Sequence, residues 1–328
     1  MIKSSHINRN KYKYFVFTTI EDYLNVNIFK SKSHNEYNIS LKKYNSESNS
    51  NREVLNPNWV TGYCDGEAAF MFSVSSSKKG KLGLSFRPRF QIAVHESDSY
   101  ILHDIKNFFL GIGSIRKIGL YYYYKVESFK EINEIIIPHF NNYPLLTKNK
   151  FKSFYLLKRC IDFMKDNKDM NRKQLLNLLR YKASFKLGLK SQIFETYQDI
   201  IPLDQKDIPY LPTQKINPYW LAGFVAADGS FGVYRRGGKY MNYGCTFRIS
   251  QDKVDELLLG NIADFLGCGK ISRSKSGMRD LGVFAISDHN TIIIPFFSKY
   301  KICTSKEKDF KYFCEIVDIF NKKGRNKR

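Results

Sequence analysis

The sequence predicts an α+β protein built from two similar halves related by a pseudo-twofold axis. Three blocks recur in the same order in the two parts of the chain, and each combines helix-like and strand-like patterns. The block pairs are LNPNWVTGYCDGEAAF (55–70) with INPYWLAGFVAADGSF (216–231), FQIAVHESDSYILHDIKNFFLGIGSI (90–115) with FRISQDKVDELLLGNIADFLGCGKI (247–271), and EIIIPHFNNYPLLTKNKF (134–151) with TIIIPFFSKYKICTSKEKDF (291–310).

The spacing of the blocks is nearly constant along the 328 residues. Glu67 and Asp228 are 161 positions apart (228 − 67), and Pro138 and Pro295 are 157 apart (295 − 138). Three blocks that recur in the same order at nearly equal offsets rarely arise by chance. The predicted domains are an extension over 1–54 (a poorly ordered arm or a fused remnant), a first half over 55–165, a helical linker over 166–215, and a second half over 216–328 with a basic tail.

Each half begins with a helix, over about 57–66 and 218–227. Asn-Pro opens both helices, with proline in the first turn, where its missing N–H costs little. A strand pattern follows, and in 86–94 Phe and Ile alternate with Arg and Gln, so one strand face is apolar and the other is basic and polar. Helices should therefore cover one face of the sheet and leave the other open.

The remaining elements of each half follow from the same patterns. A second helix leads to a glycine turn and another strand pair, and a last helix closes the half. The predicted second helices cover about 97–110 and 254–266, and the closing helices cover about 151–166 and 306–321.

The charge of the chain indicates a polyanionic partner. Lys and Arg number 53 against 31 Asp and Glu, which gives a net charge of +22 and a pI near 9.6. The excess is spread along the chain, as in a folded nucleic-acid-binding protein. The sequence contains no run of about 18 apolar residues, so it predicts no membrane span. The six cysteines form no CxxC pair, and we expect buried free thiols in a reducing compartment, without a zinc site or disulfides.

Small residues recur four positions apart in the repeated first helix, where positions i and i+4 share a face. These residues are Gly62 and Gly66 in the first copy and Gly223 and Ala227 in the second. They would let the two helices pack side by side on the pseudo-twofold axis. Because an acidic residue follows each second small residue, Glu67 and Asp228 should emerge where the two helices end together.

Two carboxylates beside a basic surface indicate divalent-metal phosphoryl chemistry, because Mg²⁺ binds one or two carboxylates together with phosphates and water. The alternative is that Glu67 and Asp228 only end their helices in solvent. A carboxylate at a helix C-terminus opposes the macrodipole, which disfavours a purely structural role.

The motifs WVTGYCDGEAAF and WLAGFVAADGSF resemble those of single-chain LAGLIDADG homing endonucleases encoded in organellar introns. The resemblance covers about 55–321. It implies two αββαββα units whose four-stranded antiparallel sheets form a saddle. It also implies a monomer that cuts both strands of a long, asymmetric double-stranded DNA site with Mg²⁺. The chain is rich in residues with A/T-rich codons, namely Lys, Asn, Ile, Tyr and Phe. This composition indicates an A/T-rich organellar genome, and we expect a mitochondrial location, with the chloroplast as the alternative.

The resemblance assigns the acidic motif position to Glu67 and Asp228, as catalytic residues and metal ligands. Two positions depart from the motif. Asp65 is matched by Ala226, which removes it as a catalytic candidate. Ala68 stands where the family has glycine, and we expect it to strain the helix exit and weaken cleavage.

Further site residues follow from the matched positions and strand patterns. Lys150 and Lys306 occupy matched positions before the closing helices. The resemblance implies that a basic residue there lines the catalytic pocket and stabilises charge on the phosphate, and the alternative is a surface lysine at a helix N-terminus. Gln91 and Gln251 would lie near the metals. The basic and polar strand residues would contact bases and phosphates. The candidate DNA-binding residues are Lys78, Lys79, Lys81, Arg87, Arg89, Gln91, Arg116, Lys117, Arg235, Arg236, Lys239, Arg248, Arg273, Lys275 and Arg279.

Two other functions remain open. The first is that of an RNA maturase, which assists splicing of its host intron. The second is that of a decayed copy, which binds DNA without cutting it. The histidines show no metal-binding spacing, and neither a P-loop nor a G-x-S-x-G motif supports an NTPase or a serine hydrolase.

Overall fold

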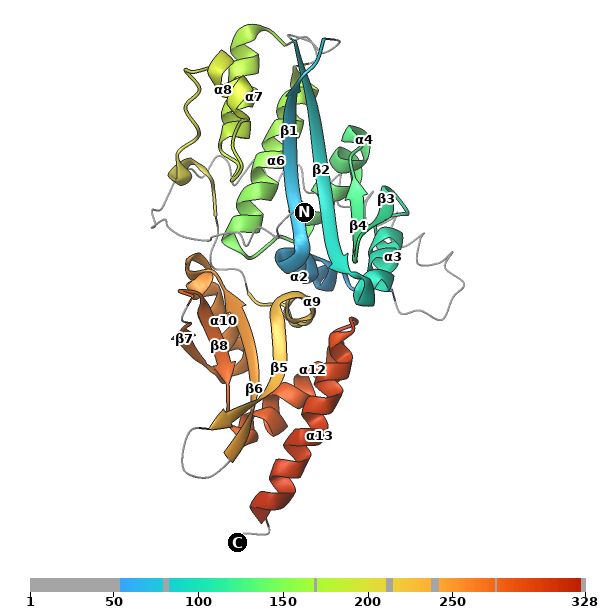
Figure 1. Ribbon diagram of the computed structural model, residues 1–328, viewed down its shortest axis with the longest axis vertical. Helices are drawn as coiled ribbons and strands as arrows, with labels where there is room; N and C mark the ends of the chain where they lie inside the picture. The colour runs from blue at the N-terminus through green and yellow to red at the C-terminus, as the bar shows by residue number, and fades with distance from the viewer. Residues whose placement is uncertain are drawn as a thin grey trace.

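The computed structural model describes residues 54–78, 83–167, 170–210, 215–236, 242–274 and 276–325. The predicted extension up to residue 53 lies outside the described residues, as do four of the candidate DNA-binding lysines: Lys79, Lys81, Lys239 and Lys275. The described chain forms two α+β halves that meet at helices α2 (Pro57–Glu67) and α9 (Pro218–Asp228) (Figure 1).

The first half contains one antiparallel sheet in the order β1-β2-β4-β3. Its elements after α2 are β1 (Ala68–Ser76), β2 (Leu84–His95), η2 (Glu96–Asp98), α3 (Ser99–Phe108), β3 (Ser114–Ile118), β4 (Tyr121–Val126), α4 (Phe129–Glu131), η3 (Ile132–Ile136), α5 (Ile137–Asn142) and α6 (Lys148–Asp166).

The second half repeats this plan with a sheet in the order β5-β6-β8-β7. Its elements after α9 are β5 (Gly229–Arg236), β6 (Asn242–Gln251), η5 (Lys253–Asp255), α10 (Glu256–Leu266), β7 (Lys270–Arg273), β8 (Arg279–Val283), α11 (Ile286–Asp288), η6 (His289–Ile293), α12 (Ile294–Lys299) and α13 (Lys306–Arg325). The prediction of two αββαββα units with four-stranded antiparallel sheets is therefore confirmed.

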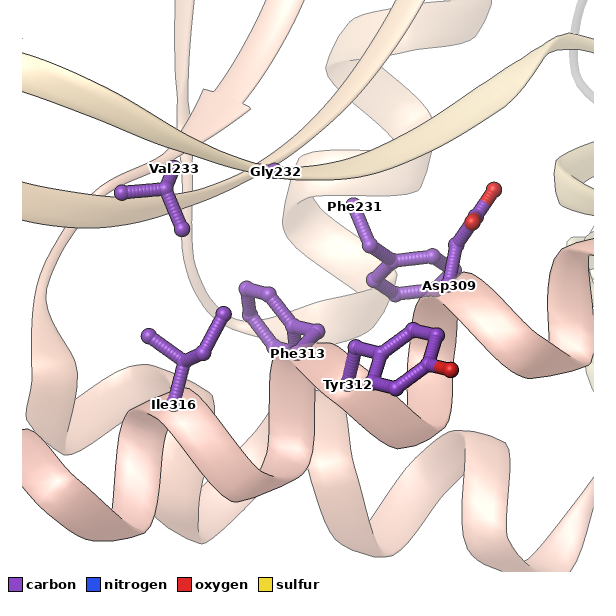
Figure 2. Close-up of a pocket in the computed structure, with 7 residues that line it drawn as sticks. All are labelled: Phe231, Gly232, Val233, Asp309, Tyr312, Phe313 and Ile316. Atoms are coloured by element: carbon purple, nitrogen blue, oxygen red, sulfur yellow. The ribbon is translucent and has the colours of Figure 1, made fainter.

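The helices of each half cover one face of its sheet, and the cores beneath them are rich in phenylalanine. Phe70 packs edge-on against Phe140 and Phe154 in the first half. In the second half, Phe231 packs edge-on against Phe297, and its ring is tilted against that of Phe313 on α13 (Figure 2). Strand β2 alternates buried and more exposed residues, as its sequence predicts. The opposite sheet face, which we call the open face, carries the polar residues of this alternation.

A π-helical turn interrupts the same helix in both halves, at η3 and η6. In each case the turn lies directly before a helix with proline in its first turn, Pro138 or Pro295. Proline lacks the backbone N–H and its ring crowds the carbonyl four residues earlier, so the helix widens over this segment. The duplication thus extends to a local backbone irregularity.

The segment between the halves is helical over α7 (Arg172–Ala183) and α8 (Ser191–Thr196). Helix α7 begins with a capping box between Asn171 and Gln174. It lies beside α6 and β1 on the outer side of the first half (Figure 1), where Leu175 and Leu178 are buried. The exact domain boundaries remain predictions.

The six cysteines are free, but they are not all buried. Cys64, Cys160 and Cys245 are buried as expected. The expectation was wrong for the other three, which are partly exposed because they lie in loops or on outer helix faces: Cys268, Cys303 and Cys314. Within the described ranges, none of the helices combines the length and apolar character needed to span a membrane.

Candidate active site

Helices α2 and α9 approach each other most closely at two glycines. A Cβ on Gly62 would overlap the carbonyl of Trp220 and lie 2.9 Å from the Phe224 nitrogen. A Cβ on Gly223 would meet the Trp59 carbonyl in the same way and lie 2.9 Å from the Tyr63 nitrogen. The two backbones therefore pack in direct contact across the pseudo-twofold axis, which only glycine allows at these positions.

The same packing brings the two helix ends together. A Cβ on Gly66 would overlap the Cβ of Ala227 and lie 3.3 Å from the carboxyl carbon of Asp228. Glu67 follows Gly66 directly and ends α2, as Asp228 ends α9. The carboxylates of the two halves thus emerge at one place.

Glu67 lies in a site that disfavours its negative charge. Burial and, to a smaller extent, the negative charge of Asp228 raise the pKa of Glu67 from 4.5 to about 7, although the positive charges of Lys150 and Lys306 oppose the rise. The carboxylate of Asp228 accepts a hydrogen bond of 2.6 Å from Gln251 Nε2. Two crowded carboxylates are a feature of functional sites, where a bound cation relieves the repulsion.

This crowding predicts a pH-dependent effect of Glu67→Gln on the metal-free protein. A carboxyl whose pKa rises on folding contributes stability that is present below pH 4.5 and is lost as the pH rises through about 7. The variant has no such loss. At pH 4.5 the unfolding free energy of Glu67→Gln should therefore equal that of the wild type. At pH 8 it should exceed the wild-type value by roughly 2–3 kcal/mol.

The measurement is urea unfolding in EDTA at both pH values. Glu195→Gln, an exposed glutamate of α8, is the matched control and should change stability by less than about 0.5 kcal/mol. Equal stability of Glu67→Gln and the wild type at pH 8 would contradict the crowding.

The two candidate lysines hold the ends of these helices. Lys306 Nζ donates to the carbonyls of Val225 (3.1 Å), Ala227 (3.1 Å) and Gly229 (2.6 Å). Lys150 Nζ donates to the carbonyl of Ala68, the residue after Glu67. Burial lowers the pKa of Lys306, and Asp228 and Glu67 oppose this. A cation at a helix C-terminus is favourable and offsets the cost of ending each helix with an acid.

Asp65 has a structural role that the sequence reasoning missed. Its Oδ1 accepts hydrogen bonds from the backbone N–H (3.0 Å) and hydroxyl (2.7 Å) of Thr147, and its Oδ2 from the Leu146 N–H (2.9 Å) and the Trp220 indole (2.8 Å). Burial raises its pKa to about 6, and these four donors oppose the rise. The bond to Trp220 makes Asp65 a link between the two halves. The only sequence signal for this role was an acid within the motif helix, before the acid that ends it.

The expected strain at Ala68 was wrong. Ala68 has φ −77° and ψ 155°, an extended conformation that any residue adopts. At the matched position in the second half, a Cβ on Gly229 would lie 2.5 Å from the Val225 side chain. The first half has the smaller Cys64 in place of valine, which leaves room for the Ala68 methyl group. The main support for a decayed copy is therefore removed.

The two candidate glutamines are not equivalent. The strand register pairs Ala68 with Ile92 and Gly229 with Ile249. Gln91 therefore matches Arg248 on the open face, and Gln251 matches the buried Val94. Only Gln251 has a hydrogen bond to an acid of the site, so the metal-ligand candidates of the two halves are held differently.

The open faces carry part of the predicted DNA-binding set. In the first sheet, Arg87 is exposed and Arg89 donates to Glu127 (2.6 Å). In the second sheet, the guanidinium of Arg248 lies 5.4 Å from the Phe284 ring centroid.

The other predicted DNA-binding residues are placed by strand register or by exposure. Gln91 and Arg116 share the open face of the first sheet by register, and Lys78 is exposed in the turn after β1. Arg235 and Arg236 end strand β5, and their side chains lie outside the description.

Three predicted DNA-binding residues of the second hairpins do not share this face. Lys117 pairs by register with Tyr122 and is bound to Glu96 at 2.8 Å. Arg273 and Arg279 are cross-strand partners, and Arg279 binds Glu256 of α10 on the helix side at 2.8 Å. In strands of four or five residues the sequence pattern was too short to show which residues face out.

Comparison with known proteins identifies the family. The model of the LAGLIDADG endonuclease family matches residues 60–161 and 221–317. The chain is 33% identical over 282 residues to "Probable intron-encoded endonuclease 2" of Neurospora crassa, covering 82% of this chain and 61% of that protein. It is 33% identical over 292 residues to "Probable intron-encoded endonuclease 3" of the same fungus, covering 86% of this chain and 53% of that protein. The chain thus spans 53–61% of the length of these relatives.

Solved structures share the fold. The I-SmaMI LAGLIDADG homing endonuclease bound to cleaved DNA has a TM-score of 0.77 and 32% identity, over 82% of this chain and 91% of that chain. I-SmaMI bound to an uncleaved DNA target with calcium ions has the same TM-score and 31% identity, over 82% of this chain and 93% of that chain. I-GzeII in complex with its DNA target has a TM-score of 0.75 and 34% identity, over 82% of this chain and 92% of that chain. The duplicated fold, the paired motif helices and these matches show that the chain belongs to the LAGLIDADG endonuclease family.

Proposed function

We propose that this chain is a site-specific endonuclease that hydrolyses both strands of double-stranded DNA with a divalent metal, Mg²⁺ in its natural setting. The observation that carries the proposal is the convergence of Glu67 and Asp228 at the ends of two packed helices, one from each half. Family membership and the DNA complexes of similar structures support it.

The residues of the site fit a metal that is shared with the substrate. In the described ranges, no group of three or more His, Cys, Asp and Glu side chains could enclose an ion. Two neighbouring carboxylates, whose mutual repulsion a cation would relieve, suit Mg²⁺, which keeps water and binds substrate phosphates in addition to one or two carboxylates. When bound, the ion would polarise the phosphodiester and supply a hydroxide from water.

The protein residues would bind, orient and neutralise charge. Glu67 and Asp228 would hold the metal at the adjoining ends of α2 and α9. Lys150 and Lys306 would keep the helix ends in place and add positive charge beside the phosphates, which stabilises charge that develops in the transition state. Gln251 would hold the Asp228 carboxylate in one orientation.

The open sheet faces would bind the DNA on either side of the cleavage centre. Basic and polar side chains alternate there with buried ones, as expected for strands that read the major groove. The two halves of one chain supply both acids, so we propose a monomer acting on an asymmetric site. One fungal relative is named as a mitochondrial protein, which supports a mitochondrial location.

The proposal is tested by incubating the protein with Mg²⁺ and a library of long randomised duplexes. We expect cleavage of a small set of related sequences, with both strands cut. Stable binding without cleavage at any site, in the presence of Mg²⁺ or Mn²⁺, would reject the endonuclease proposal.

A pair of arginines tests the assignment of the open face. Arg89 and Arg279 both lie on strands and both pair with a glutamate, but Arg89 lies on the open face and Arg279 on the helix side. Arg89→Ala should weaken binding to the selected site by about 1–3 kcal/mol, and Arg279→Ala should leave it nearly unchanged. Fluorescence anisotropy measures both. A larger loss for Arg279→Ala would place the DNA elsewhere.

A further inference from the structure

Two aspartates at matched positions have an unexpected hydrogen-bond pattern. Asp98 and Asp255 are 157 residues apart (255 − 98), the same spacing as Pro138 and Pro295. Each is the N-cap residue of a helix, α3 or α10, where aspartate normally accepts a hydrogen bond from its own helix. Neither side chain does so. Both carboxylates are therefore directed to other partners.

Their closest partners lie in the opposite half, whereas the neighbouring Ser97 hydroxyl donates a longer bond of 3.4 Å to Asp98. Asp98 accepts from the backbone N–H of Ser305 (2.7 Å) and from its hydroxyl (3.0 Å). Asp255 accepts from the backbone N–H of Lys148 at 2.7 Å. Ser305 directly precedes α13, and Lys148 is the first residue of α6. The two halves thus exchange caps, since each provides the carboxylate at the N-terminus of the other's closing helix.

These helix starts carry the two site lysines. Lys306 is the first residue of α13, and its ammonium reaches the end of α9. Lys150 is the third residue of α6 and reaches Ala68. Each capped N–H belongs to a residue only one or two positions before the lysine, so movement of the cap would displace the ammonium group directly.

The buried position of Asp255 argues against an incidental contact. Its side chain is 2% exposed, and burial of a carboxylate is costly unless strong hydrogen bonds compensate. Burial raises the pKa of Asp255 to about 7, and the bond from Lys148 opposes the rise. Asp98 is only partly buried, and its charge acts on both Glu67 and Lys306. Both aspartates thus act at the centre where the halves meet.

We propose that Asp98 and Asp255 are positioning residues that place the active-site lysine of the opposite half, so that each strand-cleavage step depends on the contact between the halves. This inference rests on the proposed endonuclease function. Asp98 acts on Lys306 and Asp255 acts on Lys150. Loss of one cap would loosen one lysine and leave both acids and the other lysine in place. Such a defect slows cleavage of one strand, whereas general destabilisation slows both.

The experiment uses the full chain and a supercoiled plasmid that carries a site selected by the wild type from the randomised library. End-labelled duplexes of the same site identify which strand is cut. Asp98→Ala should slow one strand at least about tenfold and the other less than about threefold, so nicked plasmid accumulates. The slow strand should be the one slowed by Lys306→Met. Asp255→Ala should slow the other strand, as Lys150→Met does.

Two further variants separate positioning from folding. Asp98→Asn keeps an oxygen that accepts from the Ser305 N–H, and it should recover most of the lost rate. Asp252→Ala removes a cap within the second half, where Asp252 accepts from the Val254 N–H (3.4 Å), and it should leave the ratio of the two strand rates unchanged.

Several outcomes would overturn the inference. These are equal slowing of both strands by the two alanine variants, slowing of the same strand by both, and wild-type rates. If Asp255→Ala does not fold, Asp98→Ala and Asp98→Asn decide alone, because the Asp98 carboxylate caps no helix of its own half. A wild-type protein that cuts no site would instead reject the endonuclease proposal, which is a different result from an altered strand ratio.

Discussion

Glu67→Gln and Asp228→Asn, each made alone, should each lower the rate of double-strand cleavage at least about a thousandfold, while binding to the same site persists. The substitutions keep the size of the side chains and remove the negative charge that would hold the metal. Site binding should be equal to that of the wild type or tighter, because the basic open faces remain and a carboxylate near the phosphates is lost.

The measurements are single-turnover cleavage with Mg²⁺ and anisotropy titration of the same duplex. Glu195→Gln and Asp199→Asn are matched controls, because they make the same chemical change at exposed positions of the linker region. Both should cut at the wild-type rate. If either site variant cuts both strands undiminished, its acid is not part of the cleavage centre.

Gly62→Ala and Gly223→Ala should each destabilise the protein by roughly 3 kcal/mol or more. A methyl group at either position overlaps a backbone carbonyl of the facing helix, Trp220 or Trp59, which cannot turn away as a side chain does. The helices must separate, and the acids at their ends separate with them. Cleavage should therefore fall even under conditions in which the variants remain folded.

Gly260→Ala is the matched control, because Gly260 lies within helix α10 and its new methyl group would lie 3.9 Å from the nearest side chain atom, on Ile271. Alanine is the better helix former, so this variant should be neutral or up to about 1 kcal/mol more stable. Urea unfolding compares the three variants. A loss of less than about 1 kcal/mol in Gly62→Ala and Gly223→Ala would show that the helices do not pack in direct contact.

The sequence was sufficient to predict the architecture and the acidic pair. Repetition of the blocks requires two equivalent halves, and alternation in β2 defines an apolar and an open face. Small residues four apart, followed by Glu67 and Asp228, indicate close packing of helices that end together. These features are encoded locally and occur twice, so each copy supports the interpretation of the other.

The remaining features depend on contacts between segments that are distant in sequence. The hydrogen bonds of Asp65, Asp98 and Asp255 join the two halves. No local pattern distinguishes Asp98 and Asp255 from solvent-exposed acids, and the position of Asp65 inside the motif helix does not show which partners it has. Short strands carry too few residues for alternation to be read, which misplaced Arg279 on the DNA side. The bond from Gln251 to Asp228 has no counterpart at Val94, so duplication itself suggested the wrong equivalence for Gln91.

The most direct test of the shared cleavage centre is a crystal structure of the protein with its selected DNA site and Mn²⁺, with metals located by anomalous scattering. We expect manganese between the ends of α2 and α9, with ligand oxygens from Glu67, Asp228 and phosphates of both DNA strands. Manganese bound to DNA at cleaved strands without contact to either carboxylate would contradict the account.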